Sequence, residues 1–276
     1  MKFLLPAALP VLLLVACAST TPTSPAPTSD SDPALDAAIA GSWRPAKNVA
    51  RDQYRHPRET LAFFGIRPDQ TVIEITPGGG WYTEILAPYL ADRGHYVAAL
   101  AIPSDPQGEA ASDQHALASK FAADPAHFGH AAIVEFDPKA PVFGPQASAD
   151  AVLTFRNVHN WVMAGTQAAM FRGFFDVLKP GGVLGVTDHR ANRGAATDGQ
   201  QGYVTEQQVI DYATAAGFVI DGRSQINANP ADRKDYPKGV WTLPPTLELG
   251  DTDRAKYLAI GESDRMTLRF LKPRPH

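Results

Sequence analysis

Short apolar runs alternate with longer segments of helical periodicity along most of the chain. Runs rich in Val, Ile and Ala predict strands, and apolar residues that recur every three or four positions predict helices. The predicted strands span residues 71–75, 95–102, 131–136, 150–155, 183–188, 218–223 and 266–271. The predicted helices span residues 57–64, 81–90, 114–122, 166–178 and 205–215. This alternation predicts an α/β fold with a doubly wound, mostly parallel seven-stranded sheet.

The last two predicted strands break the alternation. No long helical pattern separates them, so they predict an antiparallel hairpin at one edge of the sheet. A Pro-, Asp- and Gly-rich excursion, Asn227 to Ser263, lies between them instead. Loops of this length are often lids or binding elements, which makes Tyr236 within it a candidate substrate-binding residue.

The N-terminus has the features of a targeting segment. Lys2 precedes an apolar run, Phe3 to Ala16, which is too short to span a bilayer and has the dimensions of a secretory signal. The run ends in Leu14-Val15-Ala16-Cys17, which resembles the bacterial lipobox. Residues 1–17 are therefore predicted to be a lipoprotein signal peptide, with Cys17, the only cysteine, as the lipidation site. The alternative is an ordinary signal peptide with a chance cysteine.

A Ser-, Thr-, Pro- and Ala-rich segment follows the lipobox and is most biased between Ala18 and about Asp32. Such a composition cannot bury enough apolar surface to order itself, so residues 18–42 are predicted to form a disordered tether. Residues 43–276 then form one α/β domain. Together these segments predict a membrane-anchored lipoprotein that faces the periplasm of a bacterial envelope and touches the membrane only through its lipid.

Charge excludes one class of partner. The formal net charge is −4 and the sequence has no Lys/Arg run, whereas nucleic-acid binding requires a basic surface. We therefore expect no nucleic-acid partner.

A glycine-rich turn is the most informative motif of the chain. Thr76-Pro77-Gly78-Gly79-Gly80 follows a predicted strand that carries Glu74 near its end, and it precedes a predicted helix. Glycines let the backbone approach a ligand closely, and the helix directs free N–H groups at the turn. The alternative is a tight turn that binds nothing.

The segment Val72 to Leu86 resembles the first motif of the class I S-adenosylmethionine-dependent methyltransferases, and the run Leu178 to Gly182 before the fifth strand is also typical of them. The glycine turn and the excursion further resemble a little-characterised group of bacterial predicted methyltransferases. The resemblance implies the Rossmann-like methyltransferase fold, with the seventh strand antiparallel between the fifth and sixth. It also implies S-adenosylmethionine as cofactor. The cofactor-binding residues that it implies are Glu74, Thr76, Gly78, Gly79, Gly80 and Asp137.

Two positions depart from the family pattern. Thr76 stands where the family has glycine. The second strand, which in the family ends with an acid that binds the ribose hydroxyls, ends here in Val97-Ala98-Ala99-Leu100-Ala101. Ser104 or Asp105 could supply a polar group from the next loop. Asp137 matches the family's adenine-binding acid, although Asp-Pro is also a common surface turn.

Polar residues follow the fourth and fifth predicted strands, at the sheet edge where ligands bind in open α/β folds. His159 and His189 are candidate general bases for catalysis. Arg156, Asn157 and Arg190 are candidate substrate-binding residues. His159 could instead pack the helix that follows. Asp188 and the two histidines match no standard metal-site spacing, so we predict no metal.

These patterns predict S-adenosylmethionine-dependent methyl transfer to a small-molecule or periplasmic acceptor. The alternative is a catalytically degenerate lipoprotein that binds a ligand with the same fold. A third possibility is a different enzyme that uses the same cleft, because fold does not determine function.

Overall fold

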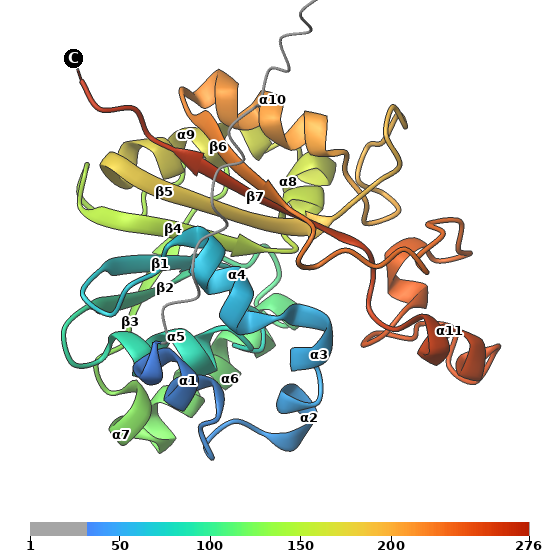
Figure 1. The fold of residues 1–276 in the computed structure, drawn as a ribbon, viewed down its shortest axis with the longest axis horizontal. Coiled ribbons are helices and arrows are strands. Elements are labelled where there is room, and N and C mark those ends of the chain that lie inside the picture. Colours follow the sequence, from blue (N-terminus) through green and yellow to red (C-terminus); the bar gives the residue numbers. More distant parts are fainter. Residues whose placement is uncertain (1–31, 276) are drawn as a thin grey trace, which may run out of the picture. The chain divides into compact units, whose positions relative to one another are not determined.

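The computed structural model describes residues 32–275, so the predicted signal peptide and Cys17 lie outside the described residues. Seven strands form one sheet in the order β3-β2-β1-β4-β5-β7-β6 (Figure 1). Their bounds are β1 Thr71–Ile75, β2 His95–Ala101, β3 Ala132–Phe136, β4 Ala149–Phe155, β5 Leu178–His189, β6 Val219–Ser224 and β7 Arg265–Leu271. Strands β1 to β5 pair in parallel, and β7 is antiparallel to both β5 and β6. The predicted sheet and its antiparallel edge are confirmed.

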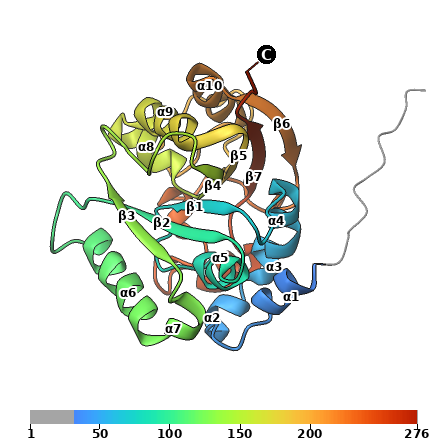
Figure 2. The same cartoon turned by 90° about the vertical axis from the view of Figure 1, so that its left-hand side faces the viewer.

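Helices cover both faces of the sheet, as a doubly wound fold requires (Figure 2). Helices α8, α9 and α10 lie on one face, and α1, α5 and α6 lie on the other. The helix bounds are α1 Pro33–Ile39, α2 Ala46–Val49, α3 Asp52–Arg55, α4 Pro57–Phe64, α5 Thr83–Leu90, α6 Glu109–Ala123, α7 Pro125–Phe128, α8 Val158–Ala164, α9 Gln167–Val177, α10 Glu206–Ala216 and α11 Arg254–Ile260. Within residues 32–275, no helix combines the length and the apolar character needed to cross a bilayer.

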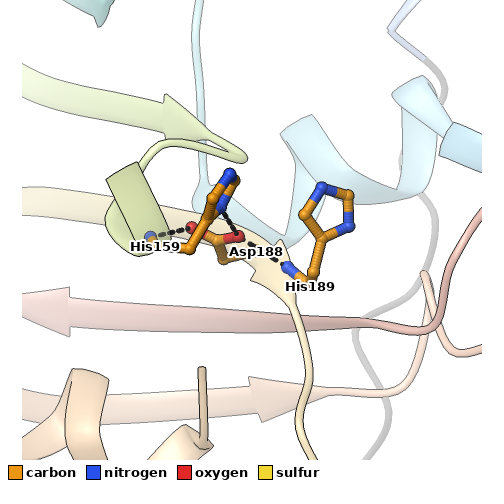
Figure 3. Close-up of side chains that lie close together, drawn as sticks. All are labelled: His159, Asp188 and His189. Carbon is orange, nitrogen blue, oxygen red and sulfur yellow. Dashed lines mark hydrogen bonds and ion pairs between the residues drawn. The ribbon is translucent and has the colours of Figure 1, made fainter. Parts of the chain in front are cut away.

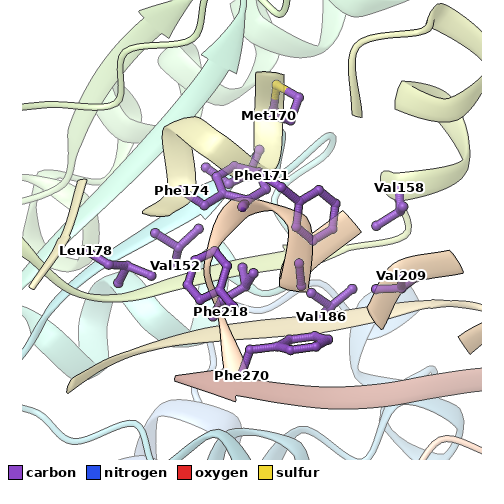
Figure 4. Packing of buried hydrophobic residues seen from close by; sticks show 14 of the residues in the cluster. Val152, Val158, Met170, Phe171, Phe174, Leu178, Val186, Val209, Phe218 and Phe270 are labelled. Carbon is purple, nitrogen blue, oxygen red and sulfur yellow. The ribbon is translucent and has the colours of Figure 1, made fainter. Parts of the chain in front are cut away.

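Two apolar cores flank the sheet because side chains alternate along each strand. On β1, Ile73 and Ile75 pack into the core under α9 and α10, whereas Val72 packs into the core under α4 and α5. Phe171 and Phe174 of α9 are fully buried in the first of these cores (Figure 4). The burial of each such ring stabilises the fold by roughly 1.5–3 kcal/mol.

The start of the folded domain differs from the prediction. Helix α1 begins at Pro33, and its residues Leu35 and Ala38 are buried in the core that contains α5. The predicted tether, residues 18–42, is therefore too long at its C-terminal end. The composition of residues 18–42 as a whole does not reveal this helix. Only two apolar residues, three positions apart, form its buried face, and that is enough to dock a short helix.

Two local predictions can be compared directly with the backbone. The capping-box spacing at Thr205 is confirmed, since its side chain accepts from Gln208 N while the Gln208 side chain accepts from the Thr205 backbone. The end of the helix predicted over residues 166–178 is confirmed to within one residue, since α9 ends at Val177 and β5 begins at Leu178. Its first residues continue the strand with a register shift against β4, between Ala149 and Ala151.

The excursion between β6 and β7 lies at the carboxyl ends of the parallel strands (right-hand side of Figure 1). It contains a 3₁₀ turn, Gly239–Thr242, and α11. Its own apolar cluster includes Tyr236, Leu243 and Tyr257. Asn227 ties its start to the domain, because its amide donates to Thr60 Oγ1 at 3.0 Å and to Thr267 Oγ1 at 2.9 Å. The excursion is therefore held against the edge of the sheet where ligands bind.

Candidate active site

The glycine turn after β1 adopts conformations that require glycine at two positions. Gly78 and Gly80 have φ angles of +56° and +78°, which L side chains rarely adopt. A Cβ atom on Gly80 would lie 2.9 Å from Leu117 Cδ1, so this glycine lets α6 pack against the turn. A Cβ atom on Gly79 would meet nothing within 4 Å. The turn is therefore both left-handed and open on one side.

Thr76, which stands at the family's glycine position, has a backbone conformation that favours glycine. Its φ angle is +47°, which is strained for a β-branched residue, and its buried Oγ1 has no hydrogen-bond partner within residues 32–275. Its backbone N–H donates to Ala99 O at 2.8 Å. The Asn157 amide donates to Ile75 O at 2.9 Å and to Thr76 O at 3.4 Å. These contacts hold the turn in a left-handed conformation although a threonine stands at the family's glycine position.

Glu74 lies beneath the turn in the apolar interior. Its Oε2 accepts hydrogen bonds from Tyr96 OH at 2.6 Å and from Thr83 Oγ1 at 2.9 Å. Burial raises the pKa of Glu74 to about 7, although both hydrogen bonds act in the opposite direction. The residue links β1, β2 and α5, and it therefore supports the turn from the side that faces away from a ligand.

A cleft of about 390 Å³ opens beside the turn at the carboxyl ends of β1 and β2. It is lined by Thr76, Gly78, Leu100, Ala101, Asp113, Gln114 and Asn160. A Cβ atom on Gly78 would lie 3.8 Å from Asp113 Oδ2, so Gly78 keeps the space in front of that carboxylate open. An acid, two amides and a glycine backbone around such a space suit the polar moiety of a nucleoside ligand.

Asp113 is a site residue that the sequence analysis missed. The family's ribose-binding acid is absent from the end of β2, but α6 brings this carboxylate to the same cleft. Asp105, the acid considered before, accepts instead from Gln107 N at 2.9 Å in an exposed turn. Asp113 lines the cleft and Asp105 does not because α6 packs against Gly80. No motif in the sequence indicates this packing.

Asp137 forms the Asp-Pro turn that was the alternative interpretation. Its side chain is exposed, and its Oδ1 accepts from Lys139 N at 2.9 Å. It lies outside the set of residues that line the cleft. Its contact with adenine stays a prediction.

Asp188 organises the two candidate histidines at the end of β5 (Figure 3). Its Oδ1 lies 3.0 Å from His159 Nδ1 and accepts from His189 N at 2.7 Å, while its Oδ2 accepts from Val158 N at 2.6 Å. In a neutral His159 ring the Asp188 contact places the proton on Nδ1. The lone pair of Nε2 is then free to accept a proton from a substrate.

His189 has a different environment. Its Nδ1 lies 2.5 Å from Ser263 Oγ in the excursion. Burial lowers the pKa of His189 well below its ordinary value, and the positive charge of Arg156 acts in the same direction. This imidazole is therefore neutral at physiological pH. It can donate or accept a hydrogen bond, but it does not supply a positive charge.

The three side chains of His159, Asp188 and His189 offer ligand atoms within 4.8 Å of one another, as a metal site would. Their surroundings disfavour a cation. Both oxygens of Asp188 already accept backbone N–H groups, and the positive charges of Arg156, Arg265 and Arg55 act on His189. The cluster is better suited to proton transfer than to metal binding.

A second pocket of about 290 Å³ lies above these histidines. It is lined by Arg156, His159, Asn160, His189, Val240, Trp241, Pro244, Pro245 and Thr246. Strand ends form one wall and the excursion forms the other, with the Trp241 and His159 ring centroids 6.1 Å apart. Asn160 lines both this pocket and the cleft at the glycine turn. The two spaces therefore adjoin at one residue.

The predicted substrate-binding residues separate into two groups. Arg156 lines the second pocket. Asn157 is engaged with the backbone of the turn, and Arg190 donates to both oxygens of Asp264 at 3.0 and 2.6 Å. Tyr236 is buried against Tyr257, with ring centroids 6.0 Å apart. The structure gives these last three residues contacts that hold the fold together.

No protein-family profile matches the sequence, and a search of curated proteins finds no match. Solved structures share the fold. A SAM-dependent methyltransferase from Aquifex aeolicus aligns with a TM-score of 0.53 at 15% identity, over 81% of this chain and 93% of that one. An S-adenosylmethionine-dependent methyltransferase from Mesorhizobium loti aligns at 0.50 and 13% identity, over 84% and 99%. The [4+2]-cyclase SpnF aligns at 0.59 and 17% identity, over 88% and 93%.

At these identities the likeness shows the fold alone, and the cyclase illustrates that one fold supports more than one reaction. The strand order with β7 between β5 and β6, and the glycine turn after β1, are the features that the resemblance to the class I methyltransferases implied. The chain therefore has the Rossmann-like fold that is also found in these S-adenosylmethionine-dependent methyltransferases.

Proposed function

We propose that the protein transfers a methyl group from S-adenosylmethionine in the glycine-turn cleft to a small molecule in the adjoining pocket. One observation carries this proposal: the two spaces meet at Asn160. A donor and an acceptor that occupy them would be neighbours, and such placement supplies much of the rate enhancement in a group transfer.

The chemistry that S-adenosylmethionine supplies when bound is an electrophilic methyl carbon, whose bond to sulfur breaks as the acceptor's lone pair forms the new bond. Thr76, Gly78 and Asp113 would hold the donor, since they line its cleft. His159 Nε2 would take the proton of the acceptor, because Asp188 fixes its other nitrogen as a donor. Excursion residues such as Trp241 and Pro244 would exclude water from the acceptor.

Binding of S-adenosylhomocysteine tests the donor cleft. Gly78→Ala puts a Cβ atom into the cleft, and Gly250→Ala is the matched control, because its φ of +60° is close to that of Gly78 and its surroundings are open. Both variants carry a similar backbone strain of roughly 1–2 kcal/mol. Calorimetric titration should show weaker binding only for Gly78→Ala. Equal affinity in the wild type and both variants would reject the proposed cleft.

Transfer itself is tested with methyl-labelled S-adenosylmethionine and a small-molecule extract of the bacterial envelope. We expect a labelled product with the wild type and none with Gly78→Ala. Tight binding of S-adenosylhomocysteine without any transfer would instead indicate a lipoprotein that binds its ligand without catalysis.

From the N-terminal sequence we also propose a lipid anchor at Cys17 and a position facing the periplasm. Cys17→Ser should abolish lipidation and move the protein out of the detergent-soluble membrane fraction. Partition of this variant like the wild type would reject the anchor.

A further inference from the structure

The pocket above His159 borders a buried cluster of arginines. Arg51, Arg55 and Arg265 each donate a hydrogen bond to Glu262, at 2.6, 3.2 and 2.9 Å. Arg156 belongs to the same electrostatic cluster. Within residues 32–275, however, its side chain forms no hydrogen bond or ion pair, and its Nε is buried without a partner. Four guanidinium groups thus surround one carboxylate.

The other members of the cluster are also incompletely paired. One Nη of Arg51, one Nη of Arg55 and Nε of Arg265 are buried without hydrogen-bond partners in the described part of the chain. An uncompensated buried charge is costly to the folded state. Burial accordingly lowers the pKa of Arg156 to about 10. An anion in the pocket would offset this cost, which makes the cluster a preformed site for negative charge.

The backbone of Arg156 shows that its position is held by its surroundings. Its φ angle is +64°, a left-handed conformation that is uncommon outside glycine, directly after the end of β4. Its backbone N–H donates to Thr187 O at 2.7 Å, which fixes the residue against β5. Residues held in such conformations cluster at active sites and ligand-binding positions.

We infer that this pocket binds the carboxylate of a small acid and that Arg156 pairs with it. The inference rests on the proposed function in taking the pocket as the acceptor site. A planar guanidinium matches the two oxygens of a carboxylate, and the residues that line the pocket include no acid to compete with it. Trp241, Pro244 and Pro245 form an apolar wall, which suits a flat hydrocarbon body.

The probes are benzoate and benzamide, which share a ring and differ in charge. Each is titrated calorimetrically into the full-length wild type, Arg156→Gln, and the matched control Arg193→Gln, whose arginine is exposed and lines a different pocket. Benzoate should bind the wild type and Arg193→Gln alike. Arg156→Gln should weaken it roughly 10- to 100-fold, the loss expected for a hydrogen bond to a charged group. Benzamide should bind more weakly and be insensitive to Arg156→Gln.

Three outcomes would overturn the inference: no benzoate binding, equal affinity of the wild type for benzoate and benzamide, or unchanged benzoate affinity in Arg156→Gln. Displacement of benzoate by lower concentrations of inorganic phosphate would overturn the choice of a carboxylate. If Arg156→Gln fails to fold, the difference between the affinities of the wild type for benzoate and for benzamide still tests whether the pocket prefers a carboxylate. A separate titration with S-adenosylhomocysteine distinguishes the two proposals. Absence of S-adenosylhomocysteine binding with Arg156-dependent benzoate binding would reject only the donor cleft, and the opposite result would reject only the carboxylate site.

Discussion

His159 Nδ1 lies 3.0 Å from Asp188 Oδ1, and both side chains are buried. Asp188 also accepts backbone N–H groups at the start of α8 and from His189, so it cannot turn away. The contact orients one imidazole at the floor of the acceptor pocket. It is the arrangement that an Asp–His pair uses to prepare a general base.

Asp188→Asn should therefore lower the turnover of methyl transfer. The amide can donate to His159 Nδ1, which would place the ring proton on Nε2 and remove the base. A general base contributes about 10²- to 10⁴-fold, so we expect a loss of that order with unchanged affinity for S-adenosylhomocysteine. Single-turnover kinetics measures it, and Asp150→Asn is the control, because Asp150 lies at the amino end of β4, opposite the strand ends that carry the two histidines. Full turnover in a folded Asp188→Asn protein would show that His159 is not the general base.

Thr76→Gly should stabilise the fold. Glycine relieves the strain at φ +47°, worth roughly 1–2 kcal/mol, and removes a buried hydroxyl that lacks a partner in the described chain. The greater freedom of glycine in the unfolded chain offsets roughly 0.5–1 kcal/mol of this gain. Thr76→Ala removes the hydroxyl and keeps the strain, so it should gain less. Urea unfolding gives the free energy of unfolding of the three proteins. A value for Thr76→Gly that is equal to or lower than that of the wild type would contradict the strain argument.

The sheet can be predicted from the sequence because its strands are buried and carry strong local patterns. Ile73 and Ile75 alternate with Val72 between two cores, and the capping box at Thr205 is a local motif whose partners lie three residues apart. Sequence patterns also place His159 and His189 at the correct sheet edge, since carboxyl ends of parallel strands share one edge.

The individual contacts of the site are harder to predict, because they depend on partners far along the chain. Arg190 and Arg156 carry the same side chain at equivalent strand ends, yet Arg190 is neutralised by Asp264, which lies 74 residues later. Asp113 reaches the cleft at the glycine turn only because α6 docks against Gly80. No local pattern records either contact.

The pH dependence of stability should reveal the buried carboxyl of Glu74. Its folded pKa of about 7 lies above the ordinary value of 4.5, so its stabilising contribution is full below 4.5 and is lost as the pH rises through 7. The loss is at most about 3–4 kcal/mol, at roughly 1.4 kcal/mol per unit of pKa. Glu74→Gln should abolish this slope.

The free energy of unfolding of wild type and Glu74→Gln, measured between pH 4.5 and 8, gives the comparison. Stability tied to the lowered pKa of His189 is lost as the pH falls below 6.5, and it cancels between the two proteins. A difference between them that stays constant with pH would show that Glu74 does not titrate in this range.

Glu262→Gln should be among the most destabilising conservative changes in the domain. Glu262 is 4% exposed and is the carboxylate that Arg51, Arg55 and Arg265 share, so its loss leaves three guanidinium groups without their counter-charge. Arg55 and Arg265 are buried and Arg51 is partly exposed, so the two buried pairs dominate the cost, which is about 3–5 kcal/mol when such a pair is broken. The surface pair of Glu248 and Lys238, at 3.4 Å, is the matched control, and Glu248→Gln should cost less than about 1 kcal/mol.

The pH dependence distinguishes lost charge from lost packing. The arginines hold the pKa of Glu262 at about 2, below its ordinary 4.5, so its contribution is present above pH 4.5 and is lost as the pH falls towards 2. The difference in unfolding free energy between wild type and Glu262→Gln should therefore be largest near pH 7 and shrink below pH 4.5. A difference that persists unchanged at pH 3 would assign the effect to packing and contradict the excess of positive charge from which the carboxylate pocket is inferred.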